Sequence, residues 1–150
     1  MKNIFWITIL FFITSCGYTA LYKDNKSHDI KITIESITGD QYINNLINLE
    51  LKNYLDSESN SEFLLDINTF YEKKVSTKDA TGKPEEFQLS LITNLNVRNN
   101  EKNFKSKFKE SLKIKNSSDK FELNNYENSI KENFARSTKE KIILKLVSLQ

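Results

Sequence analysis

Cysteine, histidine, proline and glycine are scarce in this chain of 150 residues, which has one Cys, one His, one Pro and three Gly. One Cys cannot form a disulfide within the chain, and one Cys with one His cannot supply the four ligands of a Cys/His zinc site. Lys and Arg total 22 against 20 Asp and Glu, and a formal charge this close to neutral argues against nucleic-acid binding. We therefore expect no internal disulfide, no metal site and no nucleic-acid partner.

Sequence motifs of catalysis are also missing. The chain has no Gly-rich phosphate loop, no Ser/His/Asp set and no metal-ligand spacing. An active site would have to use carboxylates, Lys, Ser or Tyr alone. We expect that the protein is not an enzyme and that it uses no cofactor.

One long apolar run stands near the beginning of the chain. Residues 4–13 carry no charge and lie between Lys2 and Thr14. Ten helical residues at about 1.5 Å each cover roughly half of a ~30 Å hydrocarbon core. The run is too short to span a membrane as a helix and has the length of a signal-peptide h-region.

The lone cysteine follows this run directly. Residues 13–16, Ile-Thr-Ser-Cys, resemble the lipobox of bacterial lipoproteins, with Ile in place of the more common Leu. A thiol can take a diacylglyceryl group as a thioether, and two or three acyl chains anchor a protein stably at about 0.8 kcal/mol per buried CH2. We expect residues 1–15 to be a lipoprotein signal peptide and Cys16 to be lipidated. The alternative is a plain signal peptide followed by an incidental Cys. Gly17 after the Cys, in place of Asp, implies sorting to the outer membrane.

The remaining 135 residues divide into a tether, residues 16–29, and a single domain, residues 30–150. Ile alternates with polar residues over 30–34, which predicts a strand, and apolar residues at helical spacing over 41–56 predict an amphipathic helix that Asp40 caps. The same signals predict three further strands and a long final helix: strands 63–71, 87–97 and 104–114, a loop over 76–86, a turn over 98–101 and a helix over 121–149. The order β-α-β-β-β-α predicts an α+β two-layer sandwich, with a mainly antiparallel four-stranded sheet and both helices on one face.

The start of the mature chain carries a family resemblance. Residues 16–22, Cys-Gly-Tyr-Thr-Ala-Leu-Tyr, resemble the Cys-Gly-aromatic opening of the lipopolysaccharide-assembly lipoprotein family, LptE, and the order of elements over the rest of the chain is similar to that family's. The resemblance implies an outer-membrane lipoprotein whose domain faces the periplasm or lies inside a barrel lumen. It implies that the domain plugs and supports an LptD-like β-barrel that inserts lipopolysaccharide in the outer leaflet, and that it binds lipopolysaccharide.

Two other functions stay open on the sequence. One is an accessory lipoprotein of another envelope machine, such as a secretion pilot or a barrel-assembly subunit. The other is a lipoprotein that binds lipid or peptidoglycan without a protein partner.

Two groups of lysines are candidate contacts for lipopolysaccharide phosphates, because a Lys ammonium binds phosphate as a point charge. The first group lies on the polar side of the strand over 104–114, and the alternative is a solvated sheet face or a charged edge that discourages pairing with other chains. The second group lies beside the 76–86 loop, and the alternative is a solvated loop. The candidates are Lys105, Lys107 and Lys109 in the first group, and Lys73 and Lys74 in the second.

Overall fold

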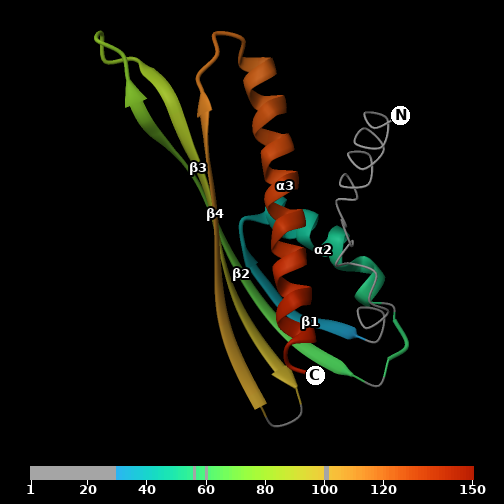
Figure 1. Cartoon of the computed structure of the whole chain (residues 1–150). Helices are drawn as coiled ribbons and strands as arrows, with labels where there is room; N and C mark the ends of the chain where they lie inside the picture. Colours follow the sequence, from blue (N-terminus) through green and yellow to red (C-terminus); the bar gives the residue numbers. More distant parts are fainter. Residues whose placement is uncertain (1–29, 56, 60, 100–101) are drawn as a thin grey trace, which may run out of the picture.

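The computed structural model describes residues 30–55, 57–59, 61–99 and 102–150. The expected signal peptide, Cys16 and the 16–29 tether lie outside these residues. The elements are, in chain order, β1 (Lys31–Gly39), α2 (Gln41–Leu55), β2 (Glu62–Lys78), β3 (Pro84–Asn99), β4 (Lys102–Lys115) and α3 (Lys120–Val147). The predicted order β-α-β-β-β-α and the α+β class are confirmed (Figure 1).

The sheet has the spatial order β1-β2-β3-β4. Strands β2, β3 and β4 are antiparallel neighbours, whereas β1 runs parallel to β2. Parallel neighbours need a crossover connection, and α2 supplies it. The sheet is therefore mixed but mainly antiparallel, as the sequence predicts.

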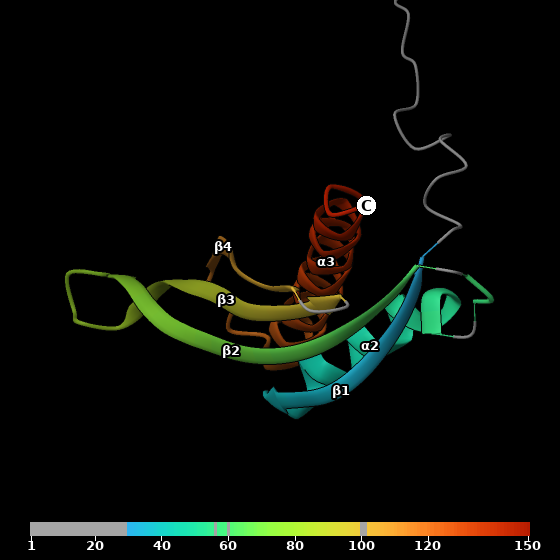
Figure 2. The ribbon, with the colours of Figure 1, turned by 90° about the horizontal axis from the view of Figure 1, so that it is seen from below.

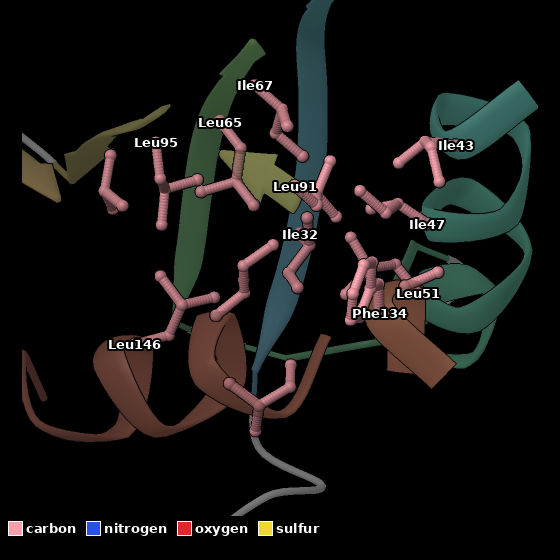
Figure 3. Close-up of a cluster of buried hydrophobic side chains, with 14 of the residues drawn as sticks. Ile32, Ile43, Ile47, Leu51, Leu65, Ile67, Leu91, Leu95, Phe134 and Leu146 are labelled. Carbon is pink, nitrogen blue, oxygen red and sulfur yellow. The ribbon is translucent and has the colours of Figure 1, made fainter. Parts of the chain in front are cut away.

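One face of the sheet packs against both helices. Alternate residues of each strand are buried on this face, and the register places them opposite one another across the sheet. Figure 3 shows side chains of α2 and α3 among those of the strands. The members that it labels are Ile32, Ile43, Ile47, Leu51, Leu65, Ile67, Leu91, Leu95, Phe134 and Leu146. We call the opposite side of the sheet, which carries the intervening polar residues, the open face.

Irregularity in β1 keeps its apolar residues on the helix side. The register with β2 shifts between Ile34 and Ser36, so the alternation that places Ile32 and Ile34 inward continues one position later at Ile37. Beyond Gly39 the chain turns into α2, where Asp40 caps the helix by accepting a hydrogen bond from the backbone N–H of Ile43 at 2.9 Å. This cap was predicted.

The loop predicted over residues 76–86 is too long. Strand β2 continues to Lys78 and β3 begins at Pro84, so only residues 79–83 form the turn. The two strands form a long arm that reaches past the end of β1 and diverges from α3 (Figure 1). Figure 2, seen from below, shows the same arm extending away from the helices. Much of the arm is exposed, and its residues are polar. Because a loop has a similar polar composition, the sequence alone predicts a loop there.

Candidate functional site

Polar side chains form two rows across all four strands on the open face. Strand register aligns the first row as Ser36, Asp66, Asn96 and Lys105, and the second as Thr38, Asn68, Asn94 and Lys107. We call these the amide rows. They line a groove of about 530 Å³, with Ser106 at its β4 side.

Hydrogen bonds tie each amide row together. In the first row, Ser36 Oγ donates to Asp66 Oδ1 at 2.7 Å and Asn96 Nδ2 donates to Asp66 Oδ2 at 3.2 Å. In the second row, Asn94 Nδ2 donates to Asn68 Oδ1 at 3.3 Å, and Asn68 Nδ2 donates to Thr38 Oγ1 at 2.9 Å. The amide donors are thus turned toward β1, and the rows hold their side chains in fixed positions.

One acceptor of the first row lacks a donor. Asn96 Oδ1 is buried and forms no hydrogen bond with any residue that the structure describes. A buried polar atom without a partner costs about 1–3 kcal/mol, so this oxygen favours a bound group that can donate to it.

The acidic side chains beside the groove are neutralised within the protein. Arg98 on β3 forms an ion pair with Glu35, and its Nη2 also lies 3.4 Å from Asp66 Oδ2. By contrast, Lys105, Lys107 and Lys109 are exposed and pair with no carboxylate in the described part of the chain. Positive charge therefore dominates the β4 side of the open face.

A row that contains apolar residues lies next to the second amide row. The next row across the sheet contains Phe70, Ile92 and Lys109. The Phe70 side chain is 56% exposed, although apolar side chains of this size are usually buried. The open face therefore combines the amide rows, the exposed ring of Phe70 and three exposed lysines of β4, which are Lys105, Lys107 and Lys109.

The predicted lysines of β2 lie elsewhere. Lys73 points to the helix side, where its Nζ lies 2.6 Å from Glu127 Oε2 and 4.7 Å from the centre of the Phe87 ring. Lys74 is 2.8 Å from Glu72 on the arm. The structure therefore brings Lys105, Lys107 and Lys109 together and separates the other two candidates from them.

Glu127 on α3 is the centre of a second polar cluster, which joins the helix to the arm. It accepts hydrogen bonds from Tyr71 Oη at 2.8 Å and Lys73 Nζ at 2.6 Å, and Lys131 Nζ lies 3.1 Å away. Burial raises the pKa of the Glu127 carboxyl, but these three donors outweigh burial and hold the pKa below its ordinary value. Burial, and then the hydrogen bond to Glu127, raise the pKa of Tyr71. The three donors share the carboxylate of Glu127, so the cluster links α3 to the arm and serves a structural role.

Asn68, Asn94 and Asn96 were missed as site residues by the sequence reasoning. The alternation of polar and apolar residues places these side chains on the polar side of each strand, so their positions could have been predicted from the sequence. Their alignment with the lysines of β4 depends on the strand register, which the sequence did not supply.

Neither a metal cluster nor a membrane-spanning helix appears in the described part of the chain. Residues 30–55, 57–59, 61–99 and 102–150 contain no group of three His, Cys, Asp or Glu side chains placed to hold a metal ion. No helix among them combines the length and the apolar character that a membrane crossing requires.

Comparison with solved structures identifies the fold. Rare lipoprotein B from Shewanella oneidensis aligns over 78% of this chain and 96% of its own, with a TM-score of 0.59 and 11% identity. The chain has the fold of rare lipoprotein B. Lipoprotein B from Nitrosomonas europaea aligns over 87% and 92%, with a TM-score of 0.59 and 9% identity. A putative lipoprotein from Caulobacter crescentus aligns over 83% and 90%, with a TM-score of 0.51 and 13% identity. No protein-family model matches the sequence, and no curated protein does.

Proposed function

We propose that this protein is an LptE-type outer-membrane lipoprotein, anchored by lipid on Cys16, that plugs and supports a β-barrel which inserts lipopolysaccharide into the outer leaflet. The observation that carries the proposal is the mixed four-stranded sheet with two helices on one face, which rare lipoprotein B shares over nearly its whole length. Rare lipoprotein B is of the LptE family. This agrees with the Cys-Gly-Tyr opening at residues 16–18.

The packing between the two layers supports a scaffold rather than a lipid carrier. Side chains from both layers pack together with almost no surface exposed to solvent, including Ile32, Leu65 and Ile47. An acyl chain needs an apolar cavity, whereas these positions are occupied by the protein's own side chains. The proposed role is non-enzymatic: the domain contributes surfaces to an assembly.

Exposed apolar side chains on the two helices support contact with a partner protein. Five large apolar side chains of α2 and α3 are exposed, which are Tyr42, Leu49, Phe121, Tyr126 and Leu144. Exposed aromatic and aliphatic side chains are common anchors of protein interfaces. We assign these side chains to the contact with the barrel.

Co-purification tests the proposal. The full chain, tagged at its C-terminus, is isolated from detergent-solubilised envelopes beside a tagged outer-membrane lipoprotein of unrelated fold. We expect a β-barrel partner to accompany only the first, and a photo-crosslinking residue at Leu49 or Leu144 to trap it. Recovery of the intact lipoprotein with no barrel would refute the proposal. Recovery of the lipoprotein together with components of a secretion or barrel-assembly machine would instead support the alternative function, an accessory lipoprotein of that machine.

A further inference from the structure

The outer side of β4 is an edge of the sheet. Strand order places β4 at one end, and no other strand of the described structure pairs with its outer side. Every second residue of an edge strand points its backbone N–H and C=O groups away from the sheet, where they can pair with a further strand. Over its 14 residues, Lys102–Lys115, β4 pairs with β3 without a register shift. This edge is therefore long and regular enough to receive an added strand.

The opposite edge of the sheet, β1, is less suited to such pairing. It has nine residues, and its register with β2 shifts between Ile34 and Ser36. A short strand and an irregularity of this kind are two of the devices by which proteins block a sheet edge. Because β4 has neither of them, it is the edge at which the sheet can be extended.

The helix side of β4 is apolar and incompletely covered. Phe104 and Phe108 are half-buried at the margin of the core, and Leu112 is 43% exposed. Glu110 lies on the same side of the strand but forms an ion pair with Lys141 of α3, so its charge is neutralised within the protein. A strand added to β4 would cover this apolar margin of the core.

The open-face side of β4 carries charge of one sign. Lys105, Lys107, Lys109 and Lys113 are exposed, and none of them forms an ion pair with a carboxylate in the described part of the chain. Side chains that lie directly opposite each other on paired strands stabilise the pair when their charges are opposite and destabilise it when their charges are alike. The strand that complements β4 therefore has acidic residues at alternate positions.

We propose that β4 binds an extended segment of a partner protein, in which acidic residues alternate with apolar ones, as an added strand of the sheet. The backbone of this segment pairs with the outer backbone groups of β4. Its acidic side chains lie beside the lysines on the open face, and its apolar side chains pack against Phe104, Phe108 and Leu112. The inference stands on the edge of β4 alone and does not rest on the proposed function.

A second copy of this chain does not complement the same edge. If two β4 strands paired antiparallel with their helices on the same side of the joined sheet, lysines would face lysines across the pair. A shift by one residue would turn the helices to opposite sides of the joined sheet and would set the lysines against the apolar margin of the other copy. The charge of β4 therefore favours an acidic partner strand over self-association.

Binding of synthetic peptides tests the inference. The full lipoprotein in non-ionic detergent is titrated with a fluorescent peptide of about ten residues that alternates Glu with Val or Ile. A second peptide has the same composition but carries its Glu residues in one block. We expect only the alternating peptide to bind, and its binding to weaken as salt rises. Equal binding of the two peptides would overturn the inference, because the lysines would then attract any acidic chain.

N-methylation of the peptide tests backbone pairing separately from charge. An N-methyl group on every residue removes the backbone donors of the alternating peptide and leaves its carboxylates unchanged. We expect this peptide to bind at least about tenfold more weakly, because an added strand depends on main-chain hydrogen bonds. Equal affinities of the methylated and unmethylated peptides would overturn the inference.

A charge reversal on β4 locates the site. Lys105→Glu with Lys107→Glu should weaken binding of the alternating Glu peptide about tenfold, and should allow binding of a peptide with Lys in place of Glu, which the parent protein rejects. The matched control, Lys52→Glu with Lys83→Glu, makes the same change of net charge outside β4 and should stay within about twofold of the parent. All four lysines are exposed, so the thermal unfolding midpoint should be unchanged.

Two results from these proteins would contradict the inference. One is equal affinity of the two double variants for the alternating Glu peptide. The other is sedimentation of the parent lipoprotein as a dimer whose β4 amides are protected from hydrogen exchange, because the edge would then be occupied by a second copy.

Discussion

Gly39 is under a tight steric constraint. Its φ is +104°, in the region that favours glycine, and a Cβ there would lie 1.8 Å from the carbonyl oxygen of Thr69. The close approach allows the chain to leave β1 and enter α2 at once, with the backbone N–H of Asp40 donating to Thr69 Oγ1 at 3.1 Å. The hydroxyl of Thr69 in turn donates to Asn44 Oδ1 on α2 at 2.6 Å.

Replacement of this glycine tests the constraint. Gly39→Ala is expected to lower the free energy of unfolding by roughly 2–4 kcal/mol, because a strained backbone and a steric overlap combine. Gly82→Ala is the matched control, since its φ is +84° but nothing lies within 4 Å of the added Cβ, and its cost should be about 1 kcal/mol. Urea unfolding measures both. Equal losses would mean that the contact with Thr69 is relieved by a backbone shift.

The carboxyl of Glu127 makes stability depend on pH. Because its folded pKa lies below the ordinary value of 4.5, the charged form is favoured by folding. The stabilisation is therefore complete above about pH 4.5 and is lost as pH falls through the lower folded pKa.

We expect Glu127→Gln to lower stability at pH 7 by about 1–2 kcal/mol, since an amide bonds the Tyr71 hydroxyl and the lysines less strongly than a carboxylate. The difference between the two proteins should shrink as pH falls below 4.5, and unfolding free energies measured from pH 7 to pH 3 check it. Glu132→Gln, on the same helix, serves as the control. A difference that stays constant over this range would contradict the assignment.

At the scale of elements, the sequence predicted which segments form strands and helices but not how far they extend. Alternation identified the middle of each strand because one side of it meets the helices. In the arm, none of residues 76–78 and 84–86 is fully buried, and none but the proline is apolar, so no apolar alternation marks them. Gly82 and Pro84 add turn signals nearby, which explains why the predicted loop was too long.

The candidate site was predictable only in part for a related reason. The lysines of β4 were found because they alternate with Phe104 and Phe108. The asparagines were passed over because Asn is abundant along the chain and was interpreted as compositional bias, and because a site that crosses four strands depends on register. Pairing of Asn96 with Lys105 follows from the register of β3 and β4, which no motif in the sequence specifies.

The start of α3 offers a test at the element scale. Asp119 accepts hydrogen bonds from the backbone N–H groups of Phe121 and Glu122, at 2.9 and 3.0 Å. Asp119→Ala should lower the unfolding free energy by about 1 kcal/mol, whereas Asp119→Asn should lose only a few tenths. Thermal and urea unfolding measure the losses. If both variants lose the same amount, charge at the helix N-terminus and not the cap is responsible.

For the whole molecule, the two faces of the sheet differ in chemistry. The helix side carries the apolar core and, on its outer surface, the side chains assigned to a protein partner. The open face carries the polar groove. A substitution on the open face should therefore leave the apolar core and the exposed helix side chains unchanged.

The proposed lipid anchor is a property of the whole molecule and depends on one residue. Cys16→Ser should abolish incorporation of labelled palmitate, leave the signal peptide uncleaved, and raise the intact mass accordingly. Ser15→Ala keeps a small residue before the cysteine and should be processed normally. Mass spectrometry and fractionation of envelopes measure both. An unchanged mature mass with unchanged membrane retention in Cys16→Ser would refute lipidation.

The parallel pairing of β1 with β2 places the start of the domain and the tip of the arm at opposite ends of β2. Because Lys31 lies beside Glu62, the chain enters the sheet at the end where β2 begins, and the 79–83 turn lies at the other end of β2. The 17 residues of β2 can span up to about 55 Å at ~3.3 Å each. With lipid on Cys16, the strand directions point the tip of the arm away from the site of entry, so the length of β2 sets how far from the tethered end the protein can reach.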